Sequence, residues 1–184
     1  MKVDPKRITY LNAPAPCVLV STVDHKGRKN VAAYGYYTTV DQFEVPSVMF
    51  GARAFQHTSK NIESTKEFVV GVPPSTLAKK VWKTGYKNEK CDDEFKECEL
   101  TPIPSETIKP FRIKECSINL ECTLLFHFVV GKHVWFVGKV NTAEIDEELY
   151  SEDNIEMRSN IDALYHISKE YFCGRNETIK VEPY

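Results

Sequence analysis

Three short stretches of the sequence gather side chains that can bind a ligand or take part in chemistry. The first is VVGKHVWFVGKV, residues 129 to 140, in which His133 opens an otherwise apolar strand after a Gly131-Lys132 turn. Imidazole changes its charge near neutral pH, so His133 is either a hydrogen-bonded structural residue or a catalytic one. His127 lies on the strand expected to face it, but no third ligand accompanies the pair, and we expect no metal site.

The second stretch is GARAFQHTSKNI, residues 51 to 62, which lies between the end of a predicted strand and the start of a predicted helix. Its hydrogen-bond donors are Arg53, His57, Thr58, Lys60 and Asn61. Free N–H groups and the helix dipole attract anions at the start of a helix, so a phosphate site is one interpretation. A solvated loop before a capped helix is the other, because the stretch contains no P-loop or dinucleotide fingerprint.

The third stretch is NVAAYGYYTTV, residues 30 to 40, which combines very small residues with aromatic and hydroxyl side chains. The small residues allow a ligand to approach the backbone closely, and the rings and hydroxyls can line a pocket for a flat ligand. The residues concerned are Ala32, Ala33, Tyr34, Gly35, Tyr36, Tyr37, Thr38 and Thr39. An ordinary strand of a β-hairpin explains the same residues, and both interpretations stay open.

Strands must position these stretches, because apolar and alternating runs dominate the chain. They are predicted at residues 17–23, 30–40, 45–51, 67–73, 117–130 and 134–146. Helices are predicted after a cap at Thr58 or Ser59 and after a cap at Ser75, and residues 83–110 are predicted to be a long loop. We therefore expect residues 1–184 to form one mainly β domain, an antiparallel barrel with a few helices packed outside it.

Within residues 117–130 the alternation has a period of two, which predicts that one face of a strand is apolar. The residues assigned to that face are Ile118, Leu120, Cys122, Leu124, Phe126 and Phe128, and the opposite face carries Asn119, Glu121 and His127.

Composition excludes several classes of function. The net charge is -2, with 24 basic and 26 acidic residues, so no excess of positive charge favours a nucleic-acid partner. No apolar run reaches the roughly 20 residues of a membrane helix, and the first residues do not resemble a signal peptide, so we expect a soluble, cytoplasmic protein. The six cysteines form no CxxC pair and are expected to be reduced structural thiols, although Cys91 and Cys98 lie in a polar stretch where they could stay exposed. Neither Gly-x-Ser-x-Gly nor HExxH is present, which removes the commonest hydrolase signatures.

Taken in order, these segments resemble the flavin reductase-like family, the FMN-binding split barrels that include flavoredoxins and the reductase components of two-component monooxygenases. The resemblance begins in PAPCVLVSTVDHKGRKNVAAYGYYTTVDQFEVPSVMFG, continues through HTSKNIESTKEFVVGVP, and closes with GKHVWFVGKV, which is similar to the family's Gly-Asp-His hairpin. It covers about residues 10 to 175. Lys132 stands where the family usually has aspartate, and ALYHISKEYFCG resembles the family's closing segment loosely, which adds His166 and Tyr171 as candidates.

The resemblance implies a homodimer that holds one FMN per subunit near the dimer interface. Residues implied to lie along the isoalloxazine ring are Ala32, Tyr36, Tyr37, Thr38 and Thr39. Residues implied to hold the ribityl phosphate are Gly51, Ala52, Arg53, His57, Thr58 and Asn61. His133 occupies the position of the Gly-Asp-His histidine, so it is implied to act catalytically, near the flavin or the nicotinamide.

The activity implied is transfer of electrons from NAD(P)H to flavin. A flavoredoxin-type carrier, whose FMN exchanges electrons with a redox protein partner, is the main alternative. A non-enzymatic module that binds flavin or haem is another, and a pyridoxamine-phosphate oxidase type of barrel is a third, which the GKH hairpin disfavours.

Overall fold

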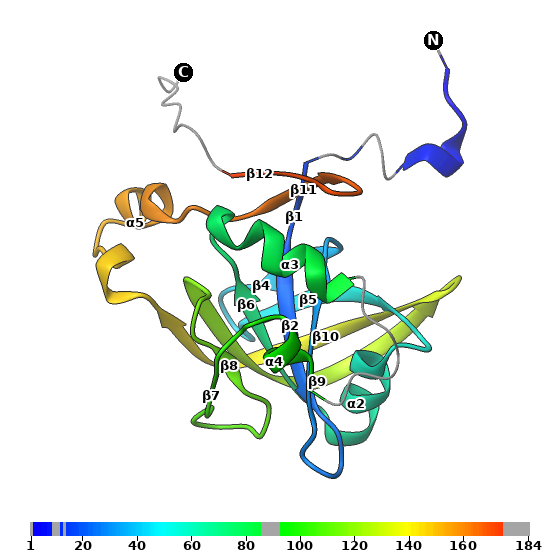
Figure 1. Cartoon of the computed structure of the whole chain (residues 1–184), viewed down its shortest axis with the longest axis horizontal. Helices are drawn as coiled ribbons and strands as arrows, with labels where there is room; N and C mark the ends of the chain where they lie inside the picture. The colour runs from blue at the N-terminus through cyan, green and yellow to red at the C-terminus, as the bar shows by residue number, and fades with distance from the viewer. Residues whose placement is uncertain (1, 9–11, 13, 86–92, 175–184) are drawn as a thin grey trace.

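A seven-stranded antiparallel sheet forms the body of the protein in a computed structural model, which describes all residues except 1, 9–11, 13, 86–92 and 175–184 (Figure 1). The strand order is β3-β2-β6-β9-β10-β5-β4. The bounds are β2 Val18–Val23, β3 Lys29–Tyr34, β4 Tyr37–Asp41, β5 Ser47–Arg53, β6 Glu67–Val72, β9 Ile118–Val130 and β10 His133–Ile145. The predicted mainly β fold with flanking helices is therefore confirmed.

The sheet curls into a barrel because its two edge strands are consecutive in the sequence. Strands about 4.8 Å apart would place the edges of a flat seven-stranded sheet roughly 29 Å from each other. The link between β3 and β4, residues 35 and 36, spans at most about 11 Å. The prediction of one strand over residues 30–40 was thus wrong in one respect: the chain leaves β2 after Tyr34 and pairs with β5 from Tyr37 onward.

Two apolar cores lie on the two sides of the strands. The first fills the barrel and contains Val18, Val20, Tyr34, Val48, Phe50, Ala52, Ile62, Phe68, Val70, Cys122, Val134 and Phe136. The second lies under α3 (Ala78–Gly85) and α4 (Glu94–Glu97), and it contains Cys17, Leu19, Val31, Leu77, Val81, Phe95, Cys98, Leu100, Ile113, Cys116 and Leu164. Cys98 is fully buried, so it is not the exposed thiol that its polar neighbours suggested, and Cys91 lies outside the described residues.

Both predicted helices form, but neither begins at the predicted cap. Helix α2 (His57–Thr65) begins after Gln56, and Thr58 and Ser59 are buried within its first turn. The Ser59 hydroxyl donates to the Arg53 carbonyl at 2.9 Å instead of capping the helix. Ser75 likewise lies inside the 3-10 helix η2 (Ser75–Leu77), after Pro74. These hydroxyls bond to other groups of the folded chain and therefore do not cap the helices.

Strand β9 contains a bulge that reverses its two faces. Phe126 pairs with Val137 and Leu124 pairs with Gly138, so Leu125 is an extra residue in β9. Leu124 therefore packs on the barrel core, whereas Phe126 and Phe128 lie 56% and 41% exposed. The prediction that these phenylalanines share the apolar face of Cys122 and Leu124 was wrong, because an extra residue shifts a period of two by one.

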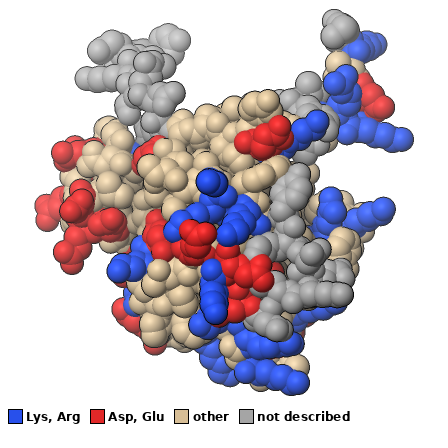
Figure 2. Space-filling model, in the orientation of Figure 1, with Lys and Arg blue, Asp and Glu red and all other residues tan. Residues whose placement is uncertain are grey.

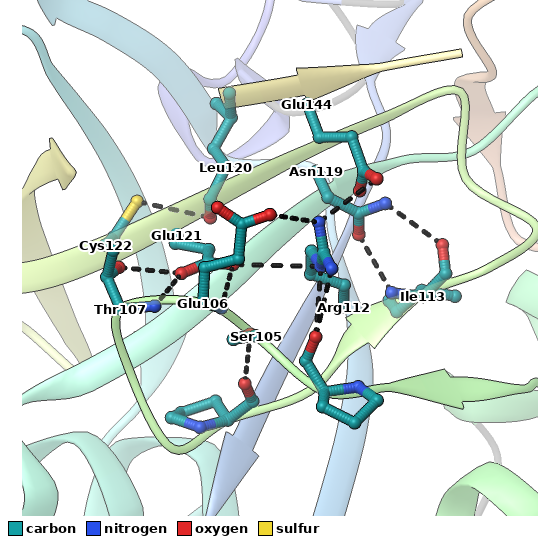
Figure 3. Close-up of polar contacts among 12 residues, drawn as sticks. Ser105, Glu106, Thr107, Arg112, Ile113, Asn119, Leu120, Glu121, Cys122 and Glu144 are labelled. Carbon is teal, nitrogen blue, oxygen red and sulfur yellow. Dashed lines mark hydrogen bonds and ion pairs between the residues drawn. The ribbon is translucent and has the colours of Figure 1, made fainter. Parts of the chain in front are cut away.

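The loop between β7 (Pro102–Ile103) and β8 (Arg112–Ile113) is held by one buried carboxylate (Figure 3). Glu121 is 1% exposed, and its two oxygens accept hydrogen bonds from the Glu106 and Thr107 backbone N–H groups, both at 2.8 Å, and from the Thr107 hydroxyl at 2.7 Å. The Arg112 guanidinium lies 3.7 Å from the same carboxylate. Part of the segment predicted as a loop is thus fixed in place by Glu121.

A small second sheet covers α3 and carries the C-terminal part of the described chain (Figure 1). Its strands are β1 (Ala15–Pro16), β11 (Tyr165–Ser168) and β12 (Tyr171–Cys173), in the order β1-β11-β12. The remaining short helices are η1 (Pro5–Arg7), η3 (Glu147–Leu149) and α5 (Asn154–Asn160). Among the described helices, none is long and apolar enough to span a bilayer.

Charges of both signs lie side by side on the face shown in Figure 2. Near α3, for example, the Lys83 ammonium lies 3.3 Å from the Glu99 carboxylate. The segment around η3 and α5 is acidic and contributes Glu147, Glu148, Glu152, Asp153 and Glu156. This face therefore carries pairs and local groups of charge, without one dominant sign.

Candidate functional site

A cavity of about 600 Å³ lies between the barrel edge and the C-terminal sheet. Its volume is within the range of small-molecule and cofactor sites, roughly 300 to 1,000 Å³. It is lined by Asn12, Ala15, Ala33, Tyr34, Gly35, Tyr36, Gly51, Ala52, Arg53, Gln56, Gly85, His133, His166, Ile167, Ser168 and Lys169. Parts of all three stretches singled out in the sequence therefore meet at one cavity.

Strand register brings His133 to this cavity. His133 is the first residue of β10 and pairs with Arg53, the last residue of β5. The ring of Tyr36 lies edge-on to the His133 ring, with 5.4 Å between centroids, and stacks on Trp135 at 5.7 Å. The hairpin turn predicted at Gly131 and Lys132 is present, and it holds the imidazole at the mouth of the cavity.

Gly51 allows the Trp135 indole to lie flat against β5. A Cβ atom at Gly51 would come within 3.3 Å of three atoms of the indole ring. The indole also stacks on Phe128, with 6.5 Å between ring centroids. The two phenylalanines turned outward by the bulge thus continue the aromatic surface that begins at Tyr36 and Trp135.

A second cavity, of about 420 Å³, adjoins the first and reaches the start of α2. The two share Ala33, Tyr34, Gln56 and Gly85. The second is also lined by Asn30, Ala32, Phe55, His57, Thr58, Lys60, Thr84 and Glu94. Arg53, His57 and Lys60 supply donors around the first turn of α2, which has no side-chain cap, so the donor set there fits an anionic group.

Thr58 and Asn61 take part in a buried polar cluster that joins α2 to β2 and β3. The Asn30 amide oxygen accepts from the Thr58 hydroxyl at 3.0 Å, and the Asn30 nitrogen donates to Glu94 at 3.0 Å. The Asn61 amide donates to the Thr22 hydroxyl, also at 3.0 Å. Thr58 reaches the second cavity, whereas Asn61 lines neither cavity and positions the helix.

The residues of β4 do not reach either cavity. Tyr37 packs against the barrel core, where burial, together with the nearby Cys122, raises the pKa of its hydroxyl to about 12. Thr38 and Thr39 are exposed, and the Thr38 hydroxyl donates to the Thr39 carbonyl. Of the residues predicted along a flat ligand in this stretch, Ala32 and Tyr36 line a cavity and these three do not.

Sequence reasoning missed Gln56 and the turn of the C-terminal sheet. The Gln56 side-chain oxygen accepts from the Arg53 N–H at 3.0 Å and lies 3.4 Å from the Tyr34 hydroxyl, so it joins the two main segments of the site. Residues 167–169 line the larger cavity beside His166, whereas Tyr171 is 63% exposed and lines neither cavity. No local pattern marks these residues, because they reach the site only through the pairing of β1 with β11.

The curled seven-stranded sheet with its flanking helices defines a split-barrel protein. The chain belongs to the flavin reductase-like FMN-binding oxidoreductase family, since the family model "Flavin reductase like domain" matches residues 10–172. An uncharacterized protein of Aquifex aeolicus is 32% identical over 154 residues, which cover 78% of each chain.

Solved structures show the same fold. Nitrilotriacetate monooxygenase component B from Bacillus cereus matches with a TM-score of 0.89 and 22% identity over 98% of both chains. Flavoredoxin of Desulfovibrio vulgaris matches with a TM-score of 0.83 and 21% identity over 98% of this chain and 97% of that one. The predicted family and the split-barrel fold are confirmed.

Proposed function

We propose that the protein binds FMN and transfers electrons to it from NADH or NADPH. One observation carries the proposal: a single cavity gathers Tyr36, Gly51, Arg53 and His133 and continues into a second cavity, which His57 and Lys60 line together with Glu94, whose carboxylate accepts from the Val31 N–H. A flat ring system with an anionic tail requires that combination of an open slot and hydrogen-bond donors.

The residues present fit FMN. The isoalloxazine would lie in the larger cavity, against the backbone of residues 33–36 and 51–52. Arg53, His57 and Lys60 would hold the ribityl phosphate together with the free N–H groups at the start of α2. Bound flavin supplies the redox chemistry, since it accepts the equivalent of a hydride from a reduced nicotinamide.

The chain's own groups position the reactants and limit water. Donors for negative charge on the ring would have to come from the cavity lining, because the Thr38 hydroxyl is bound to a neighbouring carbonyl and does not reach the cavity. His133 would donate a hydrogen bond that orients the nicotinamide, and it does not need to transfer a proton, because hydride transfer does not require a strong acid. The Tyr36 ring, which stacks on Trp135, covers one side of His133.

The test is an absorbance spectrum of the FMN-loaded protein followed by anaerobic additions of NADH and then NADPH. We expect flavin bands that bleach promptly with at least one nucleotide. Bands that persist until dithionite is added would replace this proposal with a flavoredoxin-type carrier reduced by a protein partner. A protein that does not bind FMN would refute the proposed cofactor.

His133→Ala is expected to retain FMN but to lower the rate of flavin reduction by about 10- to 100-fold, the range for losing one positioning hydrogen bond to a reacting group. Rapid-mixing absorbance measures the rate, and flavin fluorescence measures the retention of FMN. His127→Ala is the matched control, because His127 is exposed on the same hairpin and lines neither cavity. Equal rates in both variants would remove His133 from the mechanism.

We also propose that the protein works as a homodimer. The outer part of the β9–β10 hairpin carries contiguous exposed apolar residues, and exposed patches of this kind mark interaction surfaces. They are Leu125, Phe126, Phe128, Val129 and Val130. The aromatic surface that includes Phe128 and Trp135 runs from this hairpin to Tyr36 at the cavity, so a second copy seated there would also close the open side of the site.

Val130→Asp is expected to convert the dimer into monomer at micromolar concentration, because a charge would be buried without a partner in the interface. Analytical ultracentrifugation measures the mass. Ile155→Asp is the control, since Ile155 is 73% exposed on α5, away from the hairpin. A wild-type protein that sediments as a monomer would contradict the dimer.

A further inference from the structure

An apolar recess of about 210 Å³ opens from the larger cavity beneath the C-terminal sheet. It shares Ala33, Tyr34, Gly35, Gly85 and His166 with that cavity. Its inner wall is formed by Cys17, Val81, Trp82 and Phe172. The recess thus extends the proposed flavin site sideways, between the barrel and α3.

The walls of the recess are fixed by backbone pairing. Leu164, which is 1% exposed, donates its N–H to the Pro73 carbonyl at 3.0 Å and accepts from the Cys17 N–H at 3.0 Å. The hydroxyl of Ser75 is bound to the carboxylate of Asp162. Phe172 lies edge-on to Trp82, with 6.1 Å between ring centroids. The recess is therefore bounded by anchored segments on the barrel side, the α3 side and the C-terminal side.

Among the described residues that line the recess, none is an acidic residue, a lysine or an arginine. Burial raises the pKa of the Cys17 thiol to about 12, so this thiol stays neutral at ordinary pH. Transfer of a charged ligand into such surroundings would cost far more free energy than transfer of a neutral one. The occupant that suits the recess is therefore neutral and largely apolar.

His166 supplies one directional group. Its Nε2 lies 2.9 Å from the Lys169 carbonyl oxygen. In the neutral ring this contact places the proton on Nε2, which leaves Nδ1 as a hydrogen-bond acceptor. A positive φ of 49° at Lys169 makes the tight turn that brings this carbonyl under the imidazole. The recess thus combines an apolar aromatic wall with one acceptor for a hydroxyl group.

We propose that this recess binds a small neutral aromatic alcohol, with its ring against the Trp82 and Phe172 side chains that line the recess and its hydroxyl donating to Nδ1 of His166. A cavity of about 150 Å³ holds a benzene molecule, so 210 Å³ accommodates a six-membered ring with a substituent. The proposal that the recess binds this ligand depends only on the residues that line it. The position of the ligand beside a flavin rests on the proposed function.

The test is a nuclear magnetic resonance titration of the FMN-saturated protein with phenol, toluene and benzoate. The chain has two tryptophans, so the indole N–H signals of Trp82 and Trp135 can be assigned with Trp135→Phe. Phenol is expected to shift the Trp82 signal in a saturable way with one site per chain. Toluene, of similar size but without the hydroxyl, is expected to bind about tenfold more weakly. Benzoate is expected to cause no shift.

His166→Leu is expected to reduce phenol binding to the level of toluene and to leave toluene binding unchanged. His25→Leu is the control, because His25 is exposed in the turn between β2 and β3. Val81→Phe is expected to fill the recess and abolish binding of both ligands; its fold is checked by circular dichroism. A His166→Leu protein that still prefers phenol over toluene would overturn the proposal, even if Val81→Phe fails to fold.

A comparison with the FMN-free protein separates this proposal from the proposed function. If phenol binds only when FMN is absent, FMN itself occupies the recess, and the inference would be wrong. Phenol that binds to a protein with no affinity for FMN would support the recess and refute the flavin assignment alone. Equal affinities for phenol, toluene and benzoate would refute the specific site.

Discussion

Glu121→Gln is expected to lower the free energy of unfolding by about 2 to 3 kcal/mol, since hydrogen bonds to a buried charged group contribute on this scale. Both carboxylate oxygens accept backbone N–H groups, from Glu106 and Thr107. An amide offers one oxygen, so its NH₂ group would face an N–H donor with no acceptor between them. The loop that carries residues 104–110 would lose its anchor (Figure 3), and denaturant unfolding followed by circular dichroism measures the difference.

The same carboxylate predicts how stability depends on pH. Burial opposes its ionisation, but hydrogen bonds from Thr107 and from the Glu106 N–H, together with the charge of Arg112, outweigh burial and lower the pKa of Glu121 below its ordinary value of 4.5. A lowered pKa stabilises the fold above the pKa of the unfolded chain, and that stability is lost as the pH falls through the folded value. The wild-type protein is therefore expected to lose stability below about pH 4.5 more steeply than the variant.

Glu106→Gln is the matched control for this prediction. Glu106 belongs to the same loop and lies 3.5 Å from Arg112, but its side chain is 64% exposed. An exposed ion pair contributes roughly 0 to 1 kcal/mol. Similar losses in the two variants, or a Glu121→Gln protein as stable as the wild type, would show that the buried carboxylate does not hold the loop.

Arg53→Ala is expected to raise the dissociation constant of FMN by about tenfold, the lower end of the range for a charged hydrogen bond, because the Arg53 side chain is exposed. Arg53 lines the larger cavity and ends β5 next to the start of α2. The loss should shrink at high salt, since ions screen an exposed charge. Titration followed by quenching of flavin fluorescence measures the constant at low and high ionic strength.

Lys139→Ala is the control for Arg53, because Lys139 is an exposed cation on β10 that lines neither cavity. Riboflavin, which lacks the phosphate, provides a second comparison. Arg53→Ala should bind riboflavin as the wild type does. If Arg53→Ala weakens FMN and riboflavin equally, the arginine contacts the ring system and not the phosphate.

The sequence alone determined where most strands of the barrel lie and how β9 and β10 are joined. A period of two and the Gly131-Lys132 turn are local properties of the sequence, and they predicted the β9–β10 hairpin. Hydrogen-bond donors in residues 51–62 likewise marked Arg53 and His57 as candidates before their positions were known, and the family resemblance added Gly51. Gly51 and Arg53 line the larger cavity, and His57 lines the second one.

The tertiary structure alone decided which of the candidate side chains face the site. Thr58 and Asn61 look like ligand donors in the sequence, yet Asn30 and Thr22, from strands far away in the chain, hydrogen-bond to them. Long-range partners of this kind leave no local signal. Helix α2 begins after Gln56, ahead of the expected threonine or serine, and the Ser59 hydroxyl donates to the Arg53 carbonyl.

The tertiary structure also determines the bulge at Leu125 and the part of the site that β11 forms. One unpaired residue moves Phe126 and Phe128 to the opposite face, and the apolar run of Leu124, Leu125 and Phe126 interrupts the alternation at this point. His166 reaches the cavity because β1 pairs Ala15 with it across most of the chain length. Local periodicity determines the type of each element, whereas strand register and pairing depend on the free energy of the whole sheet. The residues that face the core and the residues that line the site are therefore determined by the tertiary structure.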